Sequence, residues 1–248
     1  MIVCKSDREI AYMKDAGSIV GQAHREVEKA IAPGMTTQEL DKIAEDFILA
    51  KNARPAFKGY NGFPATICAS INEQVVHGIP GLRKLENGDI ISIDIGAEIN
   101  GYFGDSAVTL PIGDVSSEAL ELIRVTEEAL YHGIEQALAG NRLSDISHGI
   151  QAFVEGQGYS VVRDYVGHGI GTQMHEEPQV PNFGRPGRGV RLRPGMTLAI
   201  EPMVNQGTFE VKTLGDSWTV VTKDSKLSAH FEHSIAITDK RPEILTKI

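Results

Sequence analysis

The sequence contains little cysteine, little tryptophan and no long apolar run. Cysteine occurs only as Cys4 and Cys68, and tryptophan only as Trp218, in 248 residues. Two cysteines cannot form the disulfide framework of a small secreted domain, and they favour a reducing cytoplasmic compartment. The longest apolar runs fall short of the ~20 residues that a membrane-spanning helix needs. The stretch MIVCKSDREI also lacks the apolar segment of a secretory signal, so we expect a cytoplasmic protein without a membrane span.

Positive charge is scarce as well. The chain has 24 Lys and Arg against 33 Asp and Glu, a net charge of −9. This balance argues against a surface that coats nucleic acid, and we expect no specific nucleic-acid partner. One basic cluster is interpreted as a solvated loop, with a docking patch for an anionic partner as the alternative. Its members are Arg185, Arg188, Arg191 and Arg193.

The pattern of the residues that are present predicts helices and strands in alternating blocks. Capping boxes at Ser6–Glu9 and Thr36–Glu39 predict helices from about 6 to 31 and from about 36 to 52. Further helices are expected at about 117–139 and 144–156. The segments between and after the helix pairs are β-rich. The predicted strands lie in ATICASI, EQVVHGI, DIISIDIGAEI, YFGDSAVTL, YSVVRDYVGHGIG, MTLAIEPMV, WTVVTKD and AHFEHSIAIT.

This order of elements, two helices followed by strands and then the same again, suggests an internal repeat. A shift of 107 residues aligns NGDIISID with PGMTLAIE and places Asp94 on Glu201. The identities are few, and chance similarity is the alternative. We expect one catalytic domain over 1–248, with half-repeats of about 1–112 and 113–248. The architecture would be α+β, with helices on the outer face of the sheet and a polar site where the halves meet.

Two aspartates lie in an apolar run that reads as a β-hairpin. Asn100-Gly101 is a strong signal for a two-residue turn, because both residues tolerate positive φ. This turn would pair Asp94 with Ala107 and place Asp105 diagonally next to Asp94 on the same face. Buried carboxylates require a counter-charge, so the arrangement predicts a cation between them.

Three further polar residues stand at the edges of apolar strands, namely His168, Glu201 and Glu232. Taken singly, Asp94 could be a turn residue and His168 could be bonded to the backbone. Taken together, four acids and a histidine indicate a divalent metal site, with Mn, Fe or Co favoured and Zn possible. Two ions bridged by carboxylates are an arrangement known for hydrolysis.

The ordered segments SIDIG, YFGDSA, GHGIG, HEEP, AIEPM and FEHSIAIT resemble those of type I methionine aminopeptidases, dinuclear metallohydrolases of the pita-bread fold. The segments NEQVVHGIP and WTVVTKD also match this family, so the resemblance covers essentially the whole chain. It implies a pita-bread fold with a pseudo-two-fold repeat. No zinc-binding N-terminal extension and no type II insertion is found, so we expect a minimal bacterial type I form.

The resemblance also implies the metal ligands and the reaction. Asp105 and Glu232 would bridge two ions (Co, Mn, Fe or Zn), Asp94 would bind one of them, and His168 and Glu201 would bind the other. A metal-bound hydroxide would then remove the N-terminal methionine from nascent proteins and peptides.

Two further histidines acquire catalytic roles from the resemblance. Glu201 would shuttle a proton, His175 would lie near the substrate carbonyl and His77 near the scissile nitrogen. Either histidine is a donor suited to a developing charge. For His77, a strand-end histidine bonded to the backbone is the alternative.

The resemblance nominates a methionine pocket, although any of its residues could be plain core. Met174 stands where many family members carry phenylalanine, and Asn61 where many carry histidine. A flexible thioether in place of a ring should loosen the selection of methionine. The nominated residues are Tyr60, Phe63, Cys68, Met174 and Trp218. Cys68 is interpreted as a pocket wall and not as a nucleophile, because no activating histidine is found in a matching pattern.

The implied partners are the N-termini of nascent polypeptides, with transient contact to the ribosome, and the implied state is a monomer. An Xaa-Pro aminopeptidase or prolidase is the nearest alternative, but those proteins resemble longer chains with a separate N-terminal domain. A scaffold on the same fold that has lost its metals is the other alternative, and all five candidate ligands are present here.

Overall fold

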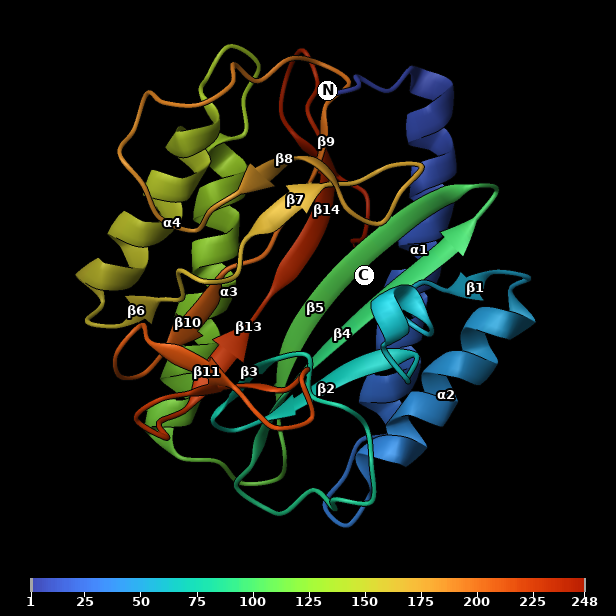
Figure 1. The fold of residues 1–248 in the computed structure, drawn as a ribbon, viewed down its shortest axis with the longest axis vertical. Coiled ribbons are helices and arrows are strands. Elements are labelled where there is room, and N and C mark those ends of the chain that lie inside the picture. Colours follow the sequence, from blue (N-terminus) through green and yellow to red (C-terminus); the bar gives the residue numbers. More distant parts are fainter. Residues whose placement is uncertain (1, 248) are drawn as a thin grey trace.

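Two pairs of helices flank a central antiparallel sheet in the computed structural model, which describes residues 2–247 (Figure 1). The predicted capping boxes are present, since the Ser6 and Thr36 side chains accept from the backbone N–H of Glu9 and Glu39. The four predicted helices are confirmed, and the third ends at Gln136 rather than near residue 139. They are α1 (Asp7–Ala30), α2 (Thr37–Ala50), α3 (Ser117–Gln136) and α4 (Leu143–Gly156).

The main sheet has nine strands, and its central order is β1-β4-β5-β14-β9-β7-β8. The strand β2 pairs with β4 on one side of the β5–β14 junction, and β7 pairs with β9 on the other. The order is therefore nearly symmetrical about this junction, as the predicted pseudo-two-fold repeat requires. The strands are β1 (Arg54–Pro55), β2 (Ile67–Ile71), β4 (Ile90–Ile99), β5 (Tyr102–Pro111), β7 (Gly167–Gly169), β8 (Glu176–Val180), β9 (Thr197–Ile200), β14 (Glu232–Ala236) and β15 (Glu243–Ile244).

Two small sheets complete the fold and divide strands that the sequence predicted as continuous. The run 196–204 breaks at Glu201-Pro202, and the run 229–238 breaks at Phe231, so that each run contributes to two sheets. The backbone N–H of Phe231 donates to Pro202 O, which joins the two breaks. The strands β1, β8, β11 and β15 were not predicted. The small sheets are β6 (Ser160–Val161), β10 (Met203–Asn205) and β13 (Ser228–His230), and β3 (Gln74–Val76), β11 (Val211–Thr213) and β12 (Val220–Thr222). A 3₁₀ turn, η1, spans Tyr60–Gly62.

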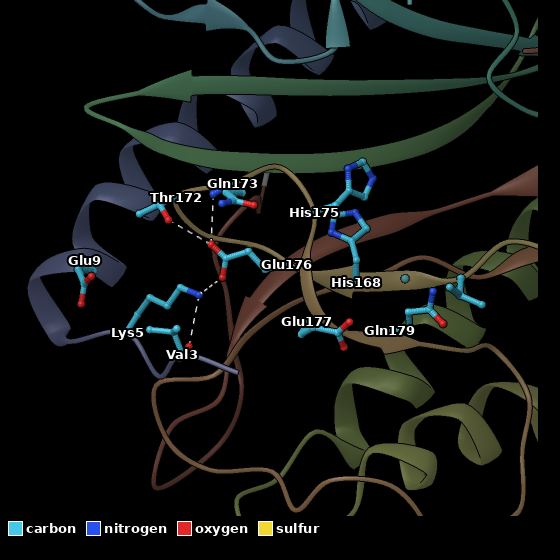
Figure 2. A pocket seen from close by; sticks show the side chains of 12 residues that line it. Val3, Lys5, Glu9, His168, Thr172, Gln173, His175, Glu176, Glu177 and Gln179 are labelled. Atoms are coloured by element: carbon cyan, nitrogen blue, oxygen red, sulfur yellow. Dashed lines mark hydrogen bonds and ion pairs between the residues drawn. The ribbon is translucent and has the colours of Figure 1, made fainter. Parts of the chain in front are cut away.

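The N-terminal segment ties down a turn that follows β7 (Figure 2). Lys5 is buried, with 4% of its side chain exposed, and its Nζ forms an ion pair with Glu176. The other carboxylate oxygen of Glu176 accepts from the backbone N–H of Gln173 at 3.2 Å. A Cβ on Gly171 would lie 2.3 Å from Lys5 Cε and 2.7 Å from Glu176 Oε1, so a larger residue at this position would displace the ion pair. The turn carrying Met174 and His175 is thus fixed by a residue far away in the sequence.

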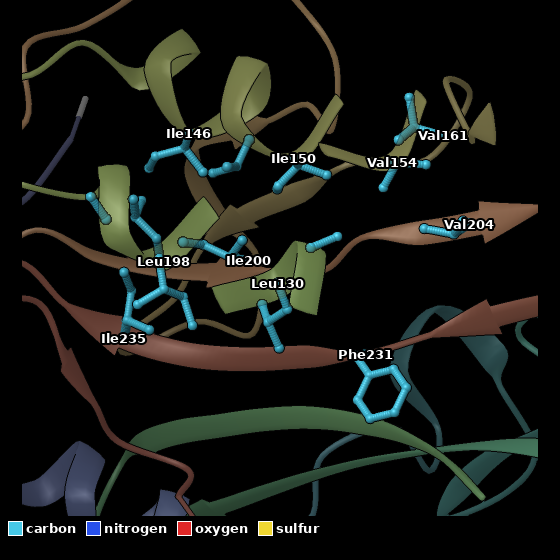
Figure 3. Packing of buried hydrophobic residues seen from close by; sticks show 14 of the residues in the cluster. Leu130, Ile146, Ile150, Val154, Val161, Leu198, Ile200, Val204, Phe231 and Ile235 are labelled. Carbon is cyan, nitrogen blue, oxygen red and sulfur yellow. The ribbon is translucent and has the colours of Figure 1, made fainter. Parts of the chain in front are cut away.

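The helices bury two apolar cores on one face of the main sheet. The first core joins α1 and α2 to β2 and β4, and the second joins α3 and α4 to β9 and β14 (Figure 3). Burial of such side chains is the main favourable term in folding. Within residues 2–247, no helix combines the length and the apolar character needed to cross a bilayer. The four clustered arginines, Arg185, Arg188, Arg191 and Arg193, are exposed on the loop between β8 and β9.

Candidate metal centre and substrate pocket

The predicted hairpin places two acids side by side. Asn100 and Gly101 form the turn with φ of 56° and 80°. The register pairs Asp94 with Ala107 and Gly96 with Asp105, as predicted. Side chains alternate between the faces of a strand, so the two aspartates lie on one face of the sheet. This is the face opposite the isoleucines of β4 that pack against α1 and α2.

The central junction of the sheet brings in Glu232. It pairs with Ala107 across β5 and β14, and Asp94 pairs with the same alanine from the other side. Asp94 and Glu232 therefore flank a small residue in one row across three strands. The hydroxyl of Ser234 exchanges hydrogen bonds with the backbone of Asp105, which holds the two central strands in this register.

The last two residues of the candidate metal site, His168 and Glu201, come from β7 and from the position directly after β9. His168 pairs with Ala199, and Glu201 lies two residues further along on the same face. His168 Nε2 is 3.7 Å from Asp105 Oδ2 and 3.6 Å from Glu201 Oε1. Its Nδ1 lies 2.8 Å from Gly169 O, which is suited to receive an N–H. That bond leaves the Nε2 lone pair directed at the carboxylates, as a metal ligand requires.

The five residues form an acidic site with unpaired oxygens, in which Asp105, His168 and Glu232 are buried and Asp94 and Glu201 are half-buried. Among residues 2–247, no hydrogen-bond partner reaches Asp94 Oδ1, Asp105 Oδ1 or Glu232 Oε1. Burial raises the pKa of all four carboxyls, and neighbouring carboxylates raise the pKa of Asp94, Glu201 and Glu232 further. Burial lowers the pKa of His168 to about 4, so its ring is neutral.

This donor set fits divalent cations. Ligand atoms of Asp105, His168 and Glu232 all lie within 4.8 Å of one another. Carboxylate oxygens and a neutral imidazole suit Mn, Fe, Co and Zn. A cation would partner the orphaned oxygens and favour ionisation of the carboxyls, which burial alone opposes.

An apolar pocket of about 260 Å³ opens onto the same face. The Phe63 and Trp218 rings meet edge to face with centroids 5.1 Å apart. Cys68 pairs with Asp94, and burial raises the pKa of its thiol well above its usual value, which agrees with a wall residue rather than a nucleophile. All five residues nominated for methionine line this pocket, and so does Asn61; Phe57, His77 and His175 line it as well.

The two predicted catalytic histidines line the pocket, where His175 is exposed and His77 is half-buried. His175 Nδ1 is 2.9 Å from the Tyr60 hydroxyl, and its ring centroid is 4.2 Å from that of His168. Figure 2 shows His175 above His168, at the end of the turn that Glu176 anchors. His77 has a left-handed backbone with φ of 60° and packs edge to face against Tyr165. Burial lowers the pKa of both histidines to about 4.

Sequence reasoning missed three residues around this site. Lys5 and Glu176 form the buried pair that anchors the His175 turn. His230 is 2% exposed and lies 3.9 Å from Glu201. Two of them had a signal in the sequence, since Glu176 stands in the segment HEEP and His230 stands two residues before Glu232. The kink at Phe231 between them could not be foreseen.

Comparison with known proteins agrees with this geometry. The model of metallopeptidase family M24 matches residues 11–239. The chain is 58% identical over 248 residues to methionine aminopeptidase 1 of Bacillus subtilis, covering 100% of both. It is 61% identical over 247 residues to methionine aminopeptidase of Clostridium acetobutylicum, covering 99% of each.

Solved structures lead to the same assignment. A methionine aminopeptidase from Thermotoga maritima superposes with a TM-score of 0.98 at 49% identity, covering 100% of both chains. An Xaa-Pro dipeptidase from Bacillus anthracis shares the fold alone, with a TM-score of 0.80 at 24% identity over 62% of its chain. These likenesses confirm the predicted pita-bread fold. The chain therefore belongs to metallopeptidase family M24 and, within it, to the type I methionine aminopeptidases.

Proposed function

We propose that this chain hydrolyses the first peptide bond of polypeptides that begin with methionine and uses two divalent ions to do so. The proposal is carried by one observation: orphaned carboxylate oxygens of Asp94, Asp105 and Glu232 share a face with an apolar pocket. Four carboxylates and two divalent ions have equal and opposite formal charge, which supports two ions rather than one.

The ions would be held by Asp94, Asp105, His168, Glu201 and Glu232. Asp105 and Glu232 would be shared between them, because these two residues lie on the central strands β5 and β14. Asp94 on β4 would complete one site, and His168 with Glu201 the other. When bound, the ions would polarise the peptide carbonyl and lower the pKa of water, so that a nucleophile is available near neutral pH.

The side chains around the ions would carry the protons. Glu201 would take a proton from the attacking water and pass it to the nitrogen of the leaving amine as the C–N bond breaks. His77 lines the cavity beside Glu201 and would donate to the scissile nitrogen region.

His175 would stabilise the oxyanion. The Tyr60 hydroxyl lies 2.9 Å from its Nδ1 and can donate to it. The proton of the neutral ring then sits on Nε2, which is left to donate to the carbonyl oxygen. The pocket walls Phe63, Cys68 and Met174 would bury the methionine side chain, and Trp218 and Tyr60 would form its rim.

The test is turnover after chelation. Met-Gly-type peptides should be cleaved only after Mn, Co, Fe or Zn is added back, and metal analysis should give two ions per chain at saturation. Preference for Ala-Pro-type peptides would contradict the proposal and favour a prolidase. Hydrolysis that ignores added metal would contradict the metal centre.

We further propose that the substrates are nascent chains in the cytoplasm, and that the enzyme is a monomer which contacts the ribosome transiently. The sequence similarity to bacterial methionine aminopeptidases supports the substrate class. All proposed ligands come from one chain, which supports the monomer. Co-sedimentation with translating ribosomes and light scattering of the free protein would test both points.

A further inference from the structure

A second, smaller cavity of about 120 Å³ lies behind Glu201, and its polar lining is only partly explained by the proposed reaction. Asp94, Glu201, His77 and His175 already have proposed roles. Two polar rings remain: that of Tyr165, whose hydroxyl lies 3.3 Å from Thr213 Oγ1, and that of His230, which is buried with 2% exposure. The full lining is Val76, His77, Asp94, Tyr165, Val166, His175, Glu201, Met203 and His230.

The backbone of His230 is fixed against the metal-site hairpin. Its N–H donates to Thr109 Oγ1 at 2.9 Å, and the same hydroxyl donates to its carbonyl oxygen at 2.8 Å. It also pairs with Met203 on β10, just beyond the break at Glu201-Pro202. The ring is therefore held at a set distance from both Glu201 and β5.

The ring itself lacks a protein partner. Within the described part of the chain, no hydrogen bond reaches His230 Nε2. A buried polar atom without a partner is costly and requires an explanation such as an ordered water. The cavity is large enough to hold water, since a single water needs only about 10–15 Å³ of such space.

The position of Glu201 indicates what partners the His230 ring. Its Oε1 lies 3.6 Å from His168 Nε2, on the side of the proposed ions. Its Oε2 lies 3.9 Å from His230 Nε2, on the side of the small cavity. A separation of 3.9 Å is too long for a direct hydrogen bond and suits a bridging water.

We propose that His230 is a positioning residue for Glu201: its Nε2–H donates to a water that in turn donates to Glu201 Oε2. This fixes the carboxylate plane, so that Oε1 faces the ions while Oε2 faces the cavity shared with His77. His230 keeps its own proton throughout, and the transferred proton stays on the path from water to Glu201 to amine. The inference rests on the proposed function, in which Glu201 carries that proton.

Two substitutions at His230, similar in size to each other, distinguish the loss of its N–H donor from the loss of its volume. His230→Leu removes the donor, and His230→Gln keeps an N–H on a side chain of comparable reach. His230→Leu should lower kcat for a Met-Gly-type peptide about tenfold to hundredfold, the range for residues that orient a metal ligand. The KM should stay unchanged, because His230 does not line the methionine pocket. His230→Gln should restore most of kcat.

Control substitutions at His24 test whether any buried histidine gives the same result. His24 is also 2% exposed, and it lies in α1 with Nε2 2.9 Å from Ser106 O. His24→Leu should lower the unfolding temperature without a selective fall in kcat. A His230→Leu protein with wild-type kcat would overturn the proposal, and so would a His230→Gln protein as slow as His230→Leu.

A readout without turnover separates this inference from the proposed function. In the zinc-loaded protein with ¹⁵N-labelled histidine, NMR should show the proton of His230 on Nε2, and Glu201→Gln should shift that resonance. A proton on Nδ1 would overturn the positioning role even in an active enzyme. If wild-type protein fails to cleave Met peptides while this signature is present, the proposed function fails and the positioning contact stands.

Discussion

The two halves of the main sheet reach the same site by different routes. In the first half, Asp94 and Asp105 stand on two continuous ten-residue strands joined by a two-residue turn. In the second half, His168 and Glu232 stand on short strands and Glu201 directly follows a third, and long stretches of sequence separate the three residues. The first pair is fixed by local strand pairing, and the second set is fixed by pairing between strands that are far apart in the sequence.

The short strands of the second half bring further side chains close to the site, which the continuous strands of the first half do not. The chain leaves the main sheet after Ile200, directly before Glu201, and enters it again at Glu232. These two breaks carry β10 and β13 into a separate sheet and bring His230 behind Glu201. Asp94 lies within the unbroken strand β4, so no such break stands beside it. The proposed proton carrier, Glu201, therefore lies in the interrupted half.

The largest expected effect distinguishes Asp94 from Glu201, the two acids that the shift of 107 residues aligns. Glu201→Gln should lower kcat by about 10³-fold at saturating metal, because it removes a proton carrier as well as a ligand. Asp94→Asn should weaken metal binding, and excess metal should recover much of its activity. Steady-state kinetics together with metal analysis tests this; equal kcat per bound ion in both variants would show that the halves are equivalent.

The next effect concerns the anchor between the N-terminal segment and the second half. Lys5→Met should lower the free energy of unfolding by about 3 kcal/mol, because Glu176 is left as a buried, unpaired charge. The exposed pair of Lys14 with Glu243, 2.7 Å apart, offers a control, and Lys14→Met should cost under ~1 kcal/mol. Urea unfolding measures both. A similar small loss in both variants would remove Lys5 as an anchor.

A smaller effect, about 2 kcal/mol between pH 6.5 and pH 5, appears as the pH falls. Burial lowers the pKa of His24, in the first half, to about 4 from an ordinary 6.5. Between these values the unfolded chain binds a proton that the folded protein does not. The free energy of unfolding should therefore fall by about 1.4 kcal/mol per pH unit from pH 6.5 down to 4 on this account.

His24→Gln lacks this titration and can still donate to Ser106 O, so its loss of stability with falling pH should be shallower by that amount. Other titrating groups are common to both proteins and cancel in the difference. Urea unfolding at pH 7, 6 and 5 provides the comparison. Parallel pH profiles would mean that His24 already gains its proton in the folded state.

The smallest effect compares pocket walls from the two halves. Trp218→Ala, at the rim, should raise KM for Met peptides about tenfold, or about 1.4 kcal/mol, without changing the unfolding temperature. Phe63→Ala, at a site only 4% exposed, should raise KM and also lower the unfolding temperature, since it opens a cavity. An unchanged KM for Trp218→Ala would exclude this ring from the pocket.

The contrast between local and long-range contacts explains which features the sequence could predict. The hairpin register followed from Asn100-Gly101, because turn chemistry and side-chain alternation are local. The breaks at Pro202 and Phe231 were not predicted, because the change of sheet depends on partners that are distant in the sequence. The edge strand β8 was not predicted either. Its segment EEPQV lacks the clear alternation of apolar and polar residues that indicates a strand.

The site itself was predicted residue by residue, yet its supports were not. All five candidate ligands meet on one face, and their metal-binding roles remain predictions. The contact of Tyr60 with His175 and the pair of Lys5 with Glu176 join segments more than 100 residues apart. No periodicity or spacing in one sequence encodes such pairs, because they depend on how separate elements pack.

The turn anchored by Glu176 also bears on how fast peptides enter and leave. One carboxylate accepts from the backbone of Gln173 on one oxygen and from Lys5 on the other. Opening the turn would expose or unpair a buried ion, so this segment is unsuited to act as a lid. We expect the entrance beside His175 to stand open at all times, and the release of products to follow their own dissociation rather than a gating motion.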